Sequence, residues 1–357
     1  MINLILDTNI YRKDIKRNTA AFQALESLIQ QKFIKLHVPN FIEREFASQL
    51  SIYYAKCYEN IMKNLNKLSE IKFLDTKTVN ILESDYFEKK KILEQSKSHF
   101  LDWLSQVNAK RYDLELESYQ ATFNDYFEGK PPYVGVKSRK DIPDSLAFQN
   151  IKQICENETN IHFISEDKGF LKACNESFSD LKVYSSLDEF IKSDICQPLI
   201  SKSDESIVLD YCRRNVSELT NMFSHSVPSF LSGKTIESYK IPDDNHEGYI
   251  VSAGEPDEVE YLFDRAVYYG HGVVVIPCTF NTDVEMYYYL YKSDYAAMNE
   301  VLSVSDHSEH YYEVSQNYEV FVEAAVRFEF EITKDDGESE LELRNSEIDS
   351  LIDIEVL

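Results

Sequence analysis

The chain has 357 residues and a mass of 41.6 kDa, which is more than one ordinary domain needs and enough for two. Hydrophobic residues make up 43% and charged residues 28%, with only 9 Gly and 9 Pro, so collagen-like, low-complexity and largely disordered classes are excluded. The net charge of -25 argues, over the whole chain, against a protein held to nucleic acid by its charge. Residues 1–200, however, carry 27 basic and 29 acidic residues, whereas residues 201–357 carry 10 and 33. Nearly all of the negative charge therefore belongs to the second part of the chain.

The cysteines and the apolar segments bear on the compartment. Six scattered cysteines without a Cys-x-x-Cys pair predict free thiols in a reducing cytosol and lack the spacing of a zinc site. No stretch reaches the ~18 apolar residues of a membrane helix. The apolar start at residues 2–6 ends at Asp7 without a leading basic segment, which is unlike a signal peptide. We expect a cytoplasmic protein with no membrane partner.

Residues 1–198 predict strands alternating with helices. Short apolar runs mark the expected strands, at 2–6, 35–38, 161–164 and 181–184. Apolar residues three and four apart mark the expected helices, at 18–32, after Pro39, within 82–128, from about Asp144, from about Asp167 and at 187–193. This alternation indicates an α/β unit with a parallel sheet, interrupted by a helical insertion at about 75–130.

The pattern changes after a polar stretch at 199–206, which we interpret as a linker. Beyond it, helices are expected at 206–223 and 257–269. Strands are expected at 273–276, 328–332, 340–343 and 352–356, and in the last three apolar residues alternate strictly with polar ones. Residues 207–357 therefore predict an acidic, β-rich α+β domain.

Four acidic residues of the first part fall where secondary structure changes. Asp7 and Asp167 follow predicted strands, Asp144 opens a predicted helix, and Glu45 lies toward the apolar side of the helix after Pro39. Each has an ordinary explanation, because an isolated Asp often caps a helix and Glu45 could lie at the surface. Together, at the carboxyl edge of a parallel sheet, four carboxylates would repel one another unless cations neutralised them. Oxygen ligands in that number suit Mg²⁺ or Mn²⁺.

The four carboxylates stand in the segments Leu6-Asp7-Thr8-Asn9, Ile42-x-x-Glu45-Phe46, Asp144-Ser145-Leu146-Ala147 and Ile164-Ser165-x-Asp167. In this order the segments resemble the four acidic motifs of PIN-domain nucleases, over roughly residues 1–195. The stretch from Pro131 to Asp144 is similar to that of a narrower bacterial PIN-like group with a PPF…EFPDA motif. The resemblance implies a three-layer α/β/α fold and divalent-metal-dependent cleavage, most often of RNA. The long insertion between Glu45 and Asp144 departs from a minimal PIN domain.

The resemblance also implies residue roles. Asp7, Glu45, Asp144 and Asp167 would be the catalytic residues and the metal ligands. Glu43 competes with Glu45 for the second acid, because helix register is not fixed by sequence. Supporting roles would fall to Asn9 and Ser165, which would orient carboxylates by hydrogen bonds, and to Asp141.

The sequence therefore predicts a metal-dependent phosphodiester hydrolase that uses a metal-activated water, with RNA favoured over DNA as substrate. A toxin, an RNA-processing enzyme and an antiviral defence effector are all compatible settings. One alternative is a non-catalytic PIN-like interaction module that acts through its acidic second domain, and another is a DNA nuclease with the same acidic site. We expect the second domain to contact a protein partner or another copy of the chain, or to restrict access to the cleft, because its acidic face would repel a phosphate backbone.

Overall fold

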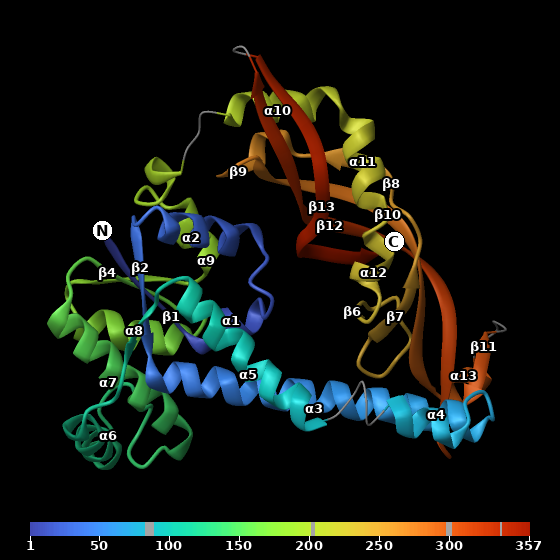
Figure 1. Ribbon diagram of the computed structural model, residues 1–357. Coiled ribbons are helices and arrows are strands. Elements are labelled where there is room, and N and C mark those ends of the chain that lie inside the picture. Colours follow the sequence, from blue (N-terminus) through green and yellow to red (C-terminus); the bar gives the residue numbers. More distant parts are fainter. Residues whose placement is uncertain (83–88, 201–203, 298–301, 336–337) are drawn as a thin grey trace. The chain divides into compact units, whose positions relative to one another are not determined.

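The computed structural model describes residues 1–82, 89–200, 204–297, 302–335 and 338–357. The chain divides into two compact units, Met1–Leu199 and Ile200–Leu357 (Figure 1). Residues 201–203 of the expected linker lie outside the described residues. Each unit has its own sheet, so the two are described separately.

A five-stranded parallel sheet forms the centre of the first unit. Its order is β3-β2-β1-β4-β5, from β1 (Ile2–Leu6), β2 (Ile34–Pro39), β3 (Lys110–Tyr112), β4 (Ile161–Ile164) and β5 (Leu181–Tyr184). Every residue of β1 and of β4 is buried. Burial on both faces explains why these strands are continuous apolar runs and not alternating ones. The expected α/β class is confirmed.

Helices cover the two faces of this sheet (Figure 1). They are α1 (Thr8–Lys13), α2 (Ala20–Gln30), α3 (Asn40–Glu70), α7 (Ile142–Asn157), α8 (Lys168–Ser177) and α9 (Leu187–Lys192), with short 3-10 turns η2 (Arg139–Asp141) and η3 (Gln197–Leu199). α2 packs against α9, and the long helix α3 packs against α7 and α1. The result is the three-layer arrangement that alternating strands and helices predict.

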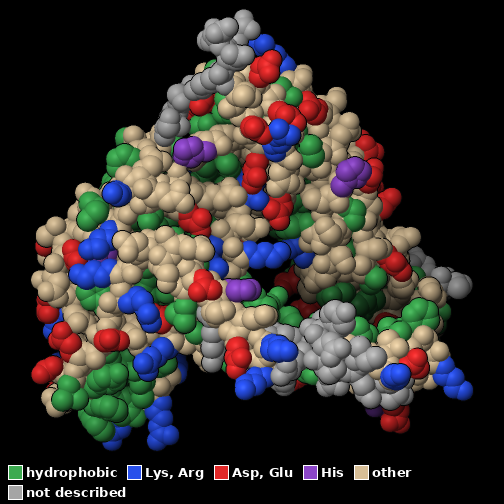
Figure 2. All heavy atoms as spheres, in the orientation of Figure 1, with side chains coloured by type: hydrophobic (Ala, Val, Ile, Leu, Met, Phe, Trp, Pro, Cys, Tyr) green, Lys and Arg blue, Asp and Glu red, His purple; other side chains and the backbone are tan. Residues whose placement is uncertain are grey.

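The insertion between α3 and α7 is mostly helical but contributes a strand to the sheet. It contains α4 (Thr76–Ile81), α5 (Lys89–Gln106), β3 and α6 (Leu116–Glu128). The helical insertion also contains the strand β3, which was not predicted, because three residues, Lys-Arg-Tyr, are too few to show a strand period. Residues 83–88 of the expected helical tract lie outside the described residues. α6 packs on α7 and leaves an apolar stripe exposed, formed by Leu116, Tyr119, Phe123 and Phe127 (Figure 2).

The second unit is built on an antiparallel sheet. The strands are β6 (Thr235–Glu237), β7 (Glu247–Ala253), β8 (Asp257–Tyr261), β9 (Val267–Gly270), β10 (Val273–Tyr291), β11 (Ser303–Asp306), β12 (Tyr311–Asp335) and β13 (Glu338–Val356). β10 and β12 pair along nineteen residues, and β13 pairs with β12. The other elements are α10 (Glu205–Arg214), α11 (Val216–Ser224), α12 (Val227–Leu231), α13 (Lys292–Ala297) and η4 (Phe263–Arg265).

Successive side chains of β10 point to opposite faces of the sheet, one buried and one more exposed. Tyr288 is buried, whereas Tyr287 and Tyr289 lie on the opposite face. The predicted helix at 257–269 was wrong, because this segment forms β8, η4 and β9. Alternation of Glu258, Val259, Glu260 and Tyr261 suits a strand with one wet face, and pairing with β10 decided the conformation.

Candidate active site

The candidate site lies where the strand order of the parallel sheet reverses. The chain leaves β1 toward β2 on one side, and β4 lies on the other side of β1. Asp7 comes directly after β1, and its N–H donates to the Ile164 carbonyl at the end of β4, at 2.9 Å. In open parallel sheets, ligands bind in the crevice outside the carboxyl ends of the strands at such a reversal. We call Asp7, Glu45, Asp144 and Asp167 the acidic cluster.

Asp7 is held by three donors. Its Oδ1 accepts from the Thr8 N–H at 2.7 Å, so it caps the first turn of α1. Its Oδ2 accepts from Asn9 Nδ2 at 2.8 Å and from Ser165 Oγ at 2.5 Å. The carboxylate therefore both caps a helix and joins the ends of β1 and β4.

Ser165 and Asn9 connect Asp7 to the segment that carries Asp167. The buried Ser165 hydroxyl also accepts from Asn9 Nδ2 at 3.0 Å and from the Asp167 N–H at 3.1 Å. Asn9 Oδ1 accepts from the Glu166 N–H at 3.2 Å. These bonds fix the geometry of the strand ends around the Asp7 carboxylate.

Glu45 approaches the cluster from α3. Its Oε2 accepts from the Thr8 hydroxyl at 2.7 Å, and Thr8 is the residue next to Asp7. Glu43 instead forms a two-pronged pair with Arg111 of β3, with Nε–Oε2 and Nη2–Oε1 distances of 2.5 and 2.6 Å. Of the two candidates for the second acid, Glu45 contacts the Asp7 segment and Glu43 joins α3 to the insertion.

Asp144 and Asp167 come from the starts of α7 and α8. Asp144 is the third residue of α7, so it does not cap that helix, and the capping interpretation was wrong for it. Asp167 caps α8, because its Oδ1 accepts from the Phe170 N–H at 2.9 Å. Asp141 is buried and accepts from the Val134 N–H at 2.9 Å, so it secures the loop before α7.

The carboxylates act on one another electrostatically. The pKa of Asp7 is raised to about 6, mainly by burial and to a smaller extent by the charges of Glu45 and Asp167, while the hydrogen bonds of Ser165 and Thr8 act in the opposite direction. The pKa of Asp144 is also raised to about 6, mainly by burial, with smaller contributions from the other three members of the cluster and from Asp141. Because each charge disfavours the next, the cluster favours a cation.

The donor set fits a hard divalent ion, because all four side chains offer carboxylate oxygens. Among the described residues, no three His, Cys, Asp or Glu side chains are grouped closely enough to hold one ion. In the absence of a cation, repulsion between the negative carboxylates favours positions further apart than metal coordination needs. The chemistry of the cluster therefore suits Mg²⁺ or Mn²⁺, and a shared coordination sphere would require the side chains to close together.

Sequence reasoning missed two residues. Thr8 links Asp7 to Glu45, and its only signal was its place inside the Asp7-Thr8-Asn9 triplet. Arg111 holds Glu43 from 68 residues away. No local sequence pattern predicts that Arg111 pairs with Glu43, because β3 aligns with β2 only in the folded sheet.

Comparison with protein families finds a match to a PIN domain model. Among the described residues, no helix is long and apolar enough to cross a membrane. Comparison with curated proteins and with solved structures finds no match. The PIN domain model matches residues 4–170, a span that includes all four members of the acidic cluster. The match supports the assignment of the first unit to the PIN-domain family, whose fold is of nuclease type.

Proposed function

We propose that the first unit is a divalent-metal-dependent nuclease that hydrolyses phosphodiester bonds, with RNA as the favoured substrate. The observation that carries the proposal is the placement of Asp7 at the carboxyl end of β1, where Thr8 links it to Glu45 and Ser165 links it to the segment of Asp167. The PIN-domain match supports the same chemistry.

Each residue has a defined part in this proposal. Asp7, Glu45, Asp144 and Asp167 would hold Mg²⁺ or Mn²⁺, which when bound supplies a Lewis acid for the phosphate and lowers the pKa of water. Ser165 and Asn9 orient the Asp7 carboxylate, and Thr8 orients Glu45. Locking these side chains in advance reduces the cost of arranging them around a substrate.

The test is a cleavage assay with the full chain in Mg²⁺ and in Mn²⁺. Single-stranded RNA, tRNA, single-stranded DNA and branched DNA are compared side by side. We expect RNA to be cleaved fastest, and Asp144→Asn to lower the rate roughly 100-fold or more. EDTA should abolish cleavage by the parent protein.

The matched control is Asp180→Asn, an exposed aspartate between α8 and β5. It removes the same charge from the same unit and should cleave at the parent rate. Equal rates for Asp144→Asn and the parent would overturn the assignment, and faster cleavage of DNA would replace RNA as the substrate.

A second candidate is a non-catalytic PIN-like module that binds nucleic acid or a protein. The observation that favours it is the spacing of the carboxylates. Among the described residues, no three His, Cys, Asp or Glu side chains lie close enough together to hold one metal ion. Absence of cleavage of every substrate, together with retained binding, would support this candidate over the nuclease.

We further propose a cytoplasmic location. All six cysteines are free, and Cys174, Cys196, Cys212 and Cys278 are buried. Free buried thiols are typical of a reducing compartment. Mass spectrometry after alkylation under denaturing conditions should find six reduced thiols in protein from cells.

A further inference from the structure

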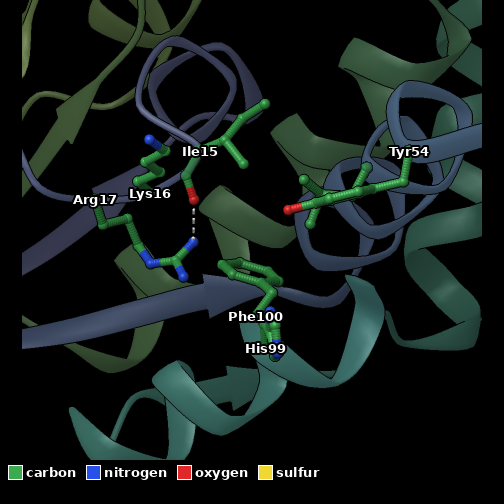
Figure 3. A pocket seen from close by; sticks show the side chains of 7 residues that line it. Ile15, Lys16, Arg17, Tyr54, His99 and Phe100 are labelled. Carbon is green, nitrogen blue, oxygen red and sulfur yellow. Dashed lines mark hydrogen bonds between the residues drawn. The ribbon is translucent and has the colours of Figure 1, made fainter. Parts of the chain in front are cut away.

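A pocket of about 270 Å³ lies in the first unit, and none of the four members of the acidic cluster lines it. Its walls come from the loop after α1, from α3 and from the insertion helix α5 (Figure 3). The lining residues are Ile15, Lys16, Arg17, Leu50, Tyr54, His99 and Phe100, and we call it the basic aromatic pocket. Its volume is near the lower end of the range for small-molecule sites, which suits one small ligand unit.

The charges of this pocket are unusual for so acidic a chain. Lys16, Arg17 and His99 line it, and no carboxylate does. Asp14 and Glu26 act on Arg17 electrostatically, but each accepts a hydrogen bond elsewhere, from the Thr19 N–H and from Trp103 Nε1. Within the described part of the chain, neither Lys16 nor His99 forms an ion pair. The pocket therefore favours an anion.

Arg17 has one buried N–H donor without a partner among the described residues. Its guanidinium lies over the Trp103 ring at 4.9 Å and near the Phe100 ring at 5.8 Å, and its Nη1 donates to the Ile15 carbonyl at 3.0 Å. Its Nε is buried and has no hydrogen-bond partner among the described residues. A buried donor without a partner is costly, so a rearrangement of the Arg17 side chain that gives this donor an acceptor would be favourable.

An aromatic side chain lies across the pocket from the loop of Lys16 and Arg17, and the Lys16 side chain extends away from it (Figure 3). Tyr54 extends from α3 with its hydroxyl toward the loop that carries Ile15 and Arg17, and Phe100 lies between them (Figure 3). Tyr54 is only half-buried, so its ring is accessible. In proteins that bind single-stranded nucleic acid, aromatic rings stack on the bases and cationic side chains bind the phosphates.

The pocket is joined to the acidic cluster by two helices. α1 has Asp7 at its first end and leads into the loop of Lys16 and Arg17 at the other, about 9 Å along its axis. α3 carries both Glu45 and Tyr54. The same two helices therefore carry residues of the pocket and residues of the acidic cluster.

We infer that the basic aromatic pocket binds one nucleotide, with Lys16 and Arg17 on the phosphate and Tyr54 against the base. If the bound nucleotide is part of the strand to be cleaved, the inference rests on the proposed nuclease function. A free nucleoside monophosphate has the same chemistry and is the other possible source of the bound nucleotide. Neither source needs a metal in the pocket.

Trp103 makes the inference directly measurable. It is the single tryptophan of the chain and contacts the Arg17 guanidinium. The full chain in EDTA is titrated with a short single-stranded RNA, with the four nucleoside 5′-monophosphates and with inorganic phosphate, and tryptophan emission is followed. A saturable change with RNA identifies the strand as the source, and one with monophosphates alone identifies the free nucleotide. No change with any probe would overturn the inference.

Two variants separate the pocket from general charge effects. Lys16→Gln, at an exposed position, should weaken RNA binding several-fold and lower the slope of log K against log salt by about 0.7. Tyr54→Leu should weaken binding without changing that slope. The controls are Lys63→Gln on α3 and Tyr119→Leu on α6, both exposed and outside the pocket, which should bind like the parent. Parent-like binding by both pocket variants would contradict the inference.

The two proposals fail in different ways. Binding in EDTA does not require cleavage. If the chain binds RNA through Lys16 but cleaves no substrate, the pocket proposal is supported and the nuclease proposal is contradicted. If cleavage depends on Asp144 but neither binding nor cleavage depends on Lys16 or Tyr54, the nuclease proposal is supported and the pocket proposal is contradicted.

Discussion

Asp7 illustrates how one side chain meets a local and a distant requirement together. Its Oδ1 caps α1, as an isolated aspartate at that position commonly does. Its Oδ2 accepts from Ser165, 158 residues further along the chain. Helix capping and membership of a site are therefore not alternatives, and the same holds for Asp167 at α8.

Glu45 and Glu43 stand two residues apart on α3 and should respond differently to loss of charge. Glu45→Gln removes a negative charge from the acidic cluster, so we expect metal-dependent cleavage to fall roughly 100-fold with little change in stability. Glu43→Gln weakens the pair with Arg111, so we expect cleavage to persist and the free energy of unfolding to fall by about 1 kcal/mol. Cleavage kinetics and urea unfolding measure the two effects.

A double-mutant cycle tests the second half of this expectation. Arg111→Gln alone should destabilise about as much as Glu43→Gln, and the double variant should cost less than the sum of the two. Additive effects would show that the pair contributes no coupling energy. Loss of cleavage in Glu43→Gln with intact folding would instead make Glu43 the second acid.

At the scale of elements, His37 joins three strands of the parallel sheet. It lies on β2, fully buried, with Nε2 2.8 Å from Asn3 Oδ1 of β1 and Nδ1 2.9 Å from the Tyr112 hydroxyl of β3. Asn3 Nδ2 donates to the Thr159 carbonyl, which fixes its Oδ1 as an acceptor, so His37 carries its proton on Nε2. Burial disfavours the charged form of the ring, so the imidazole is neutral at neutral pH, with Nδ1 facing the Tyr112 hydroxyl.

This neutral histidine should make the first unit lose stability in mild acid. Burial lowers the pKa of His37 to about 4 from an ordinary value of 6.5. Between these values the unfolded chain binds the proton and the folded chain does not, so stability is present above pH 6.5 and is lost as the pH falls toward 4. The contribution lost between pH 7.5 and pH 5 is about 2 kcal/mol. Urea unfolding followed by Trp103 emission reports on this unit.

The comparison is between the parent and His37→Gln at the two pH values. The variant lacks the titrating ring, so its unfolding free energy should fall less between pH 7.5 and pH 5 than that of the parent. His225→Gln, at an exposed histidine of the second unit, should show the parent's pH dependence. An identical pH dependence in parent and His37→Gln would refute the expectation.

At the scale of the whole molecule, charge and chemistry are divided between the units. The acidic cluster, the insertion and the basic aromatic pocket all belong to residues 1–199, which are nearly neutral. The remaining negative charge lies on residues 201–357, although Arg344 bridges one facing pair on β12 and β13, Glu331 and Glu342. Because an acidic surface repels a phosphate backbone, our prediction remains that this unit contacts a protein partner or a second copy of the chain.

A protein truncated to residues 1–199 should therefore keep metal-dependent cleavage at a rate close to that of the full chain. The unit contains its own sheet and buried core, which is the physical basis for independent folding. Cleavage of single-stranded RNA measures the rate, and circular dichroism with Trp103 emission verifies the fold. A folded truncation that neither binds nor cleaves would assign substrate binding to the second unit.

The sequence by itself determined the alternation of strands and helices in the first unit and the positions of its carboxylates along the chain. Those features depend on local periodicity and on neighbours within a few residues, which a single sequence displays. Only the tertiary structure decided which acid on α3 faces Asp7, because helix register depends on what packs against the helix. It also placed β3 at the sheet edge, turned 257–269 into strands and assembled the basic aromatic pocket from α1, α3 and α5. Those outcomes depend on pairings between distant segments, whose energy appears only when the chain is folded.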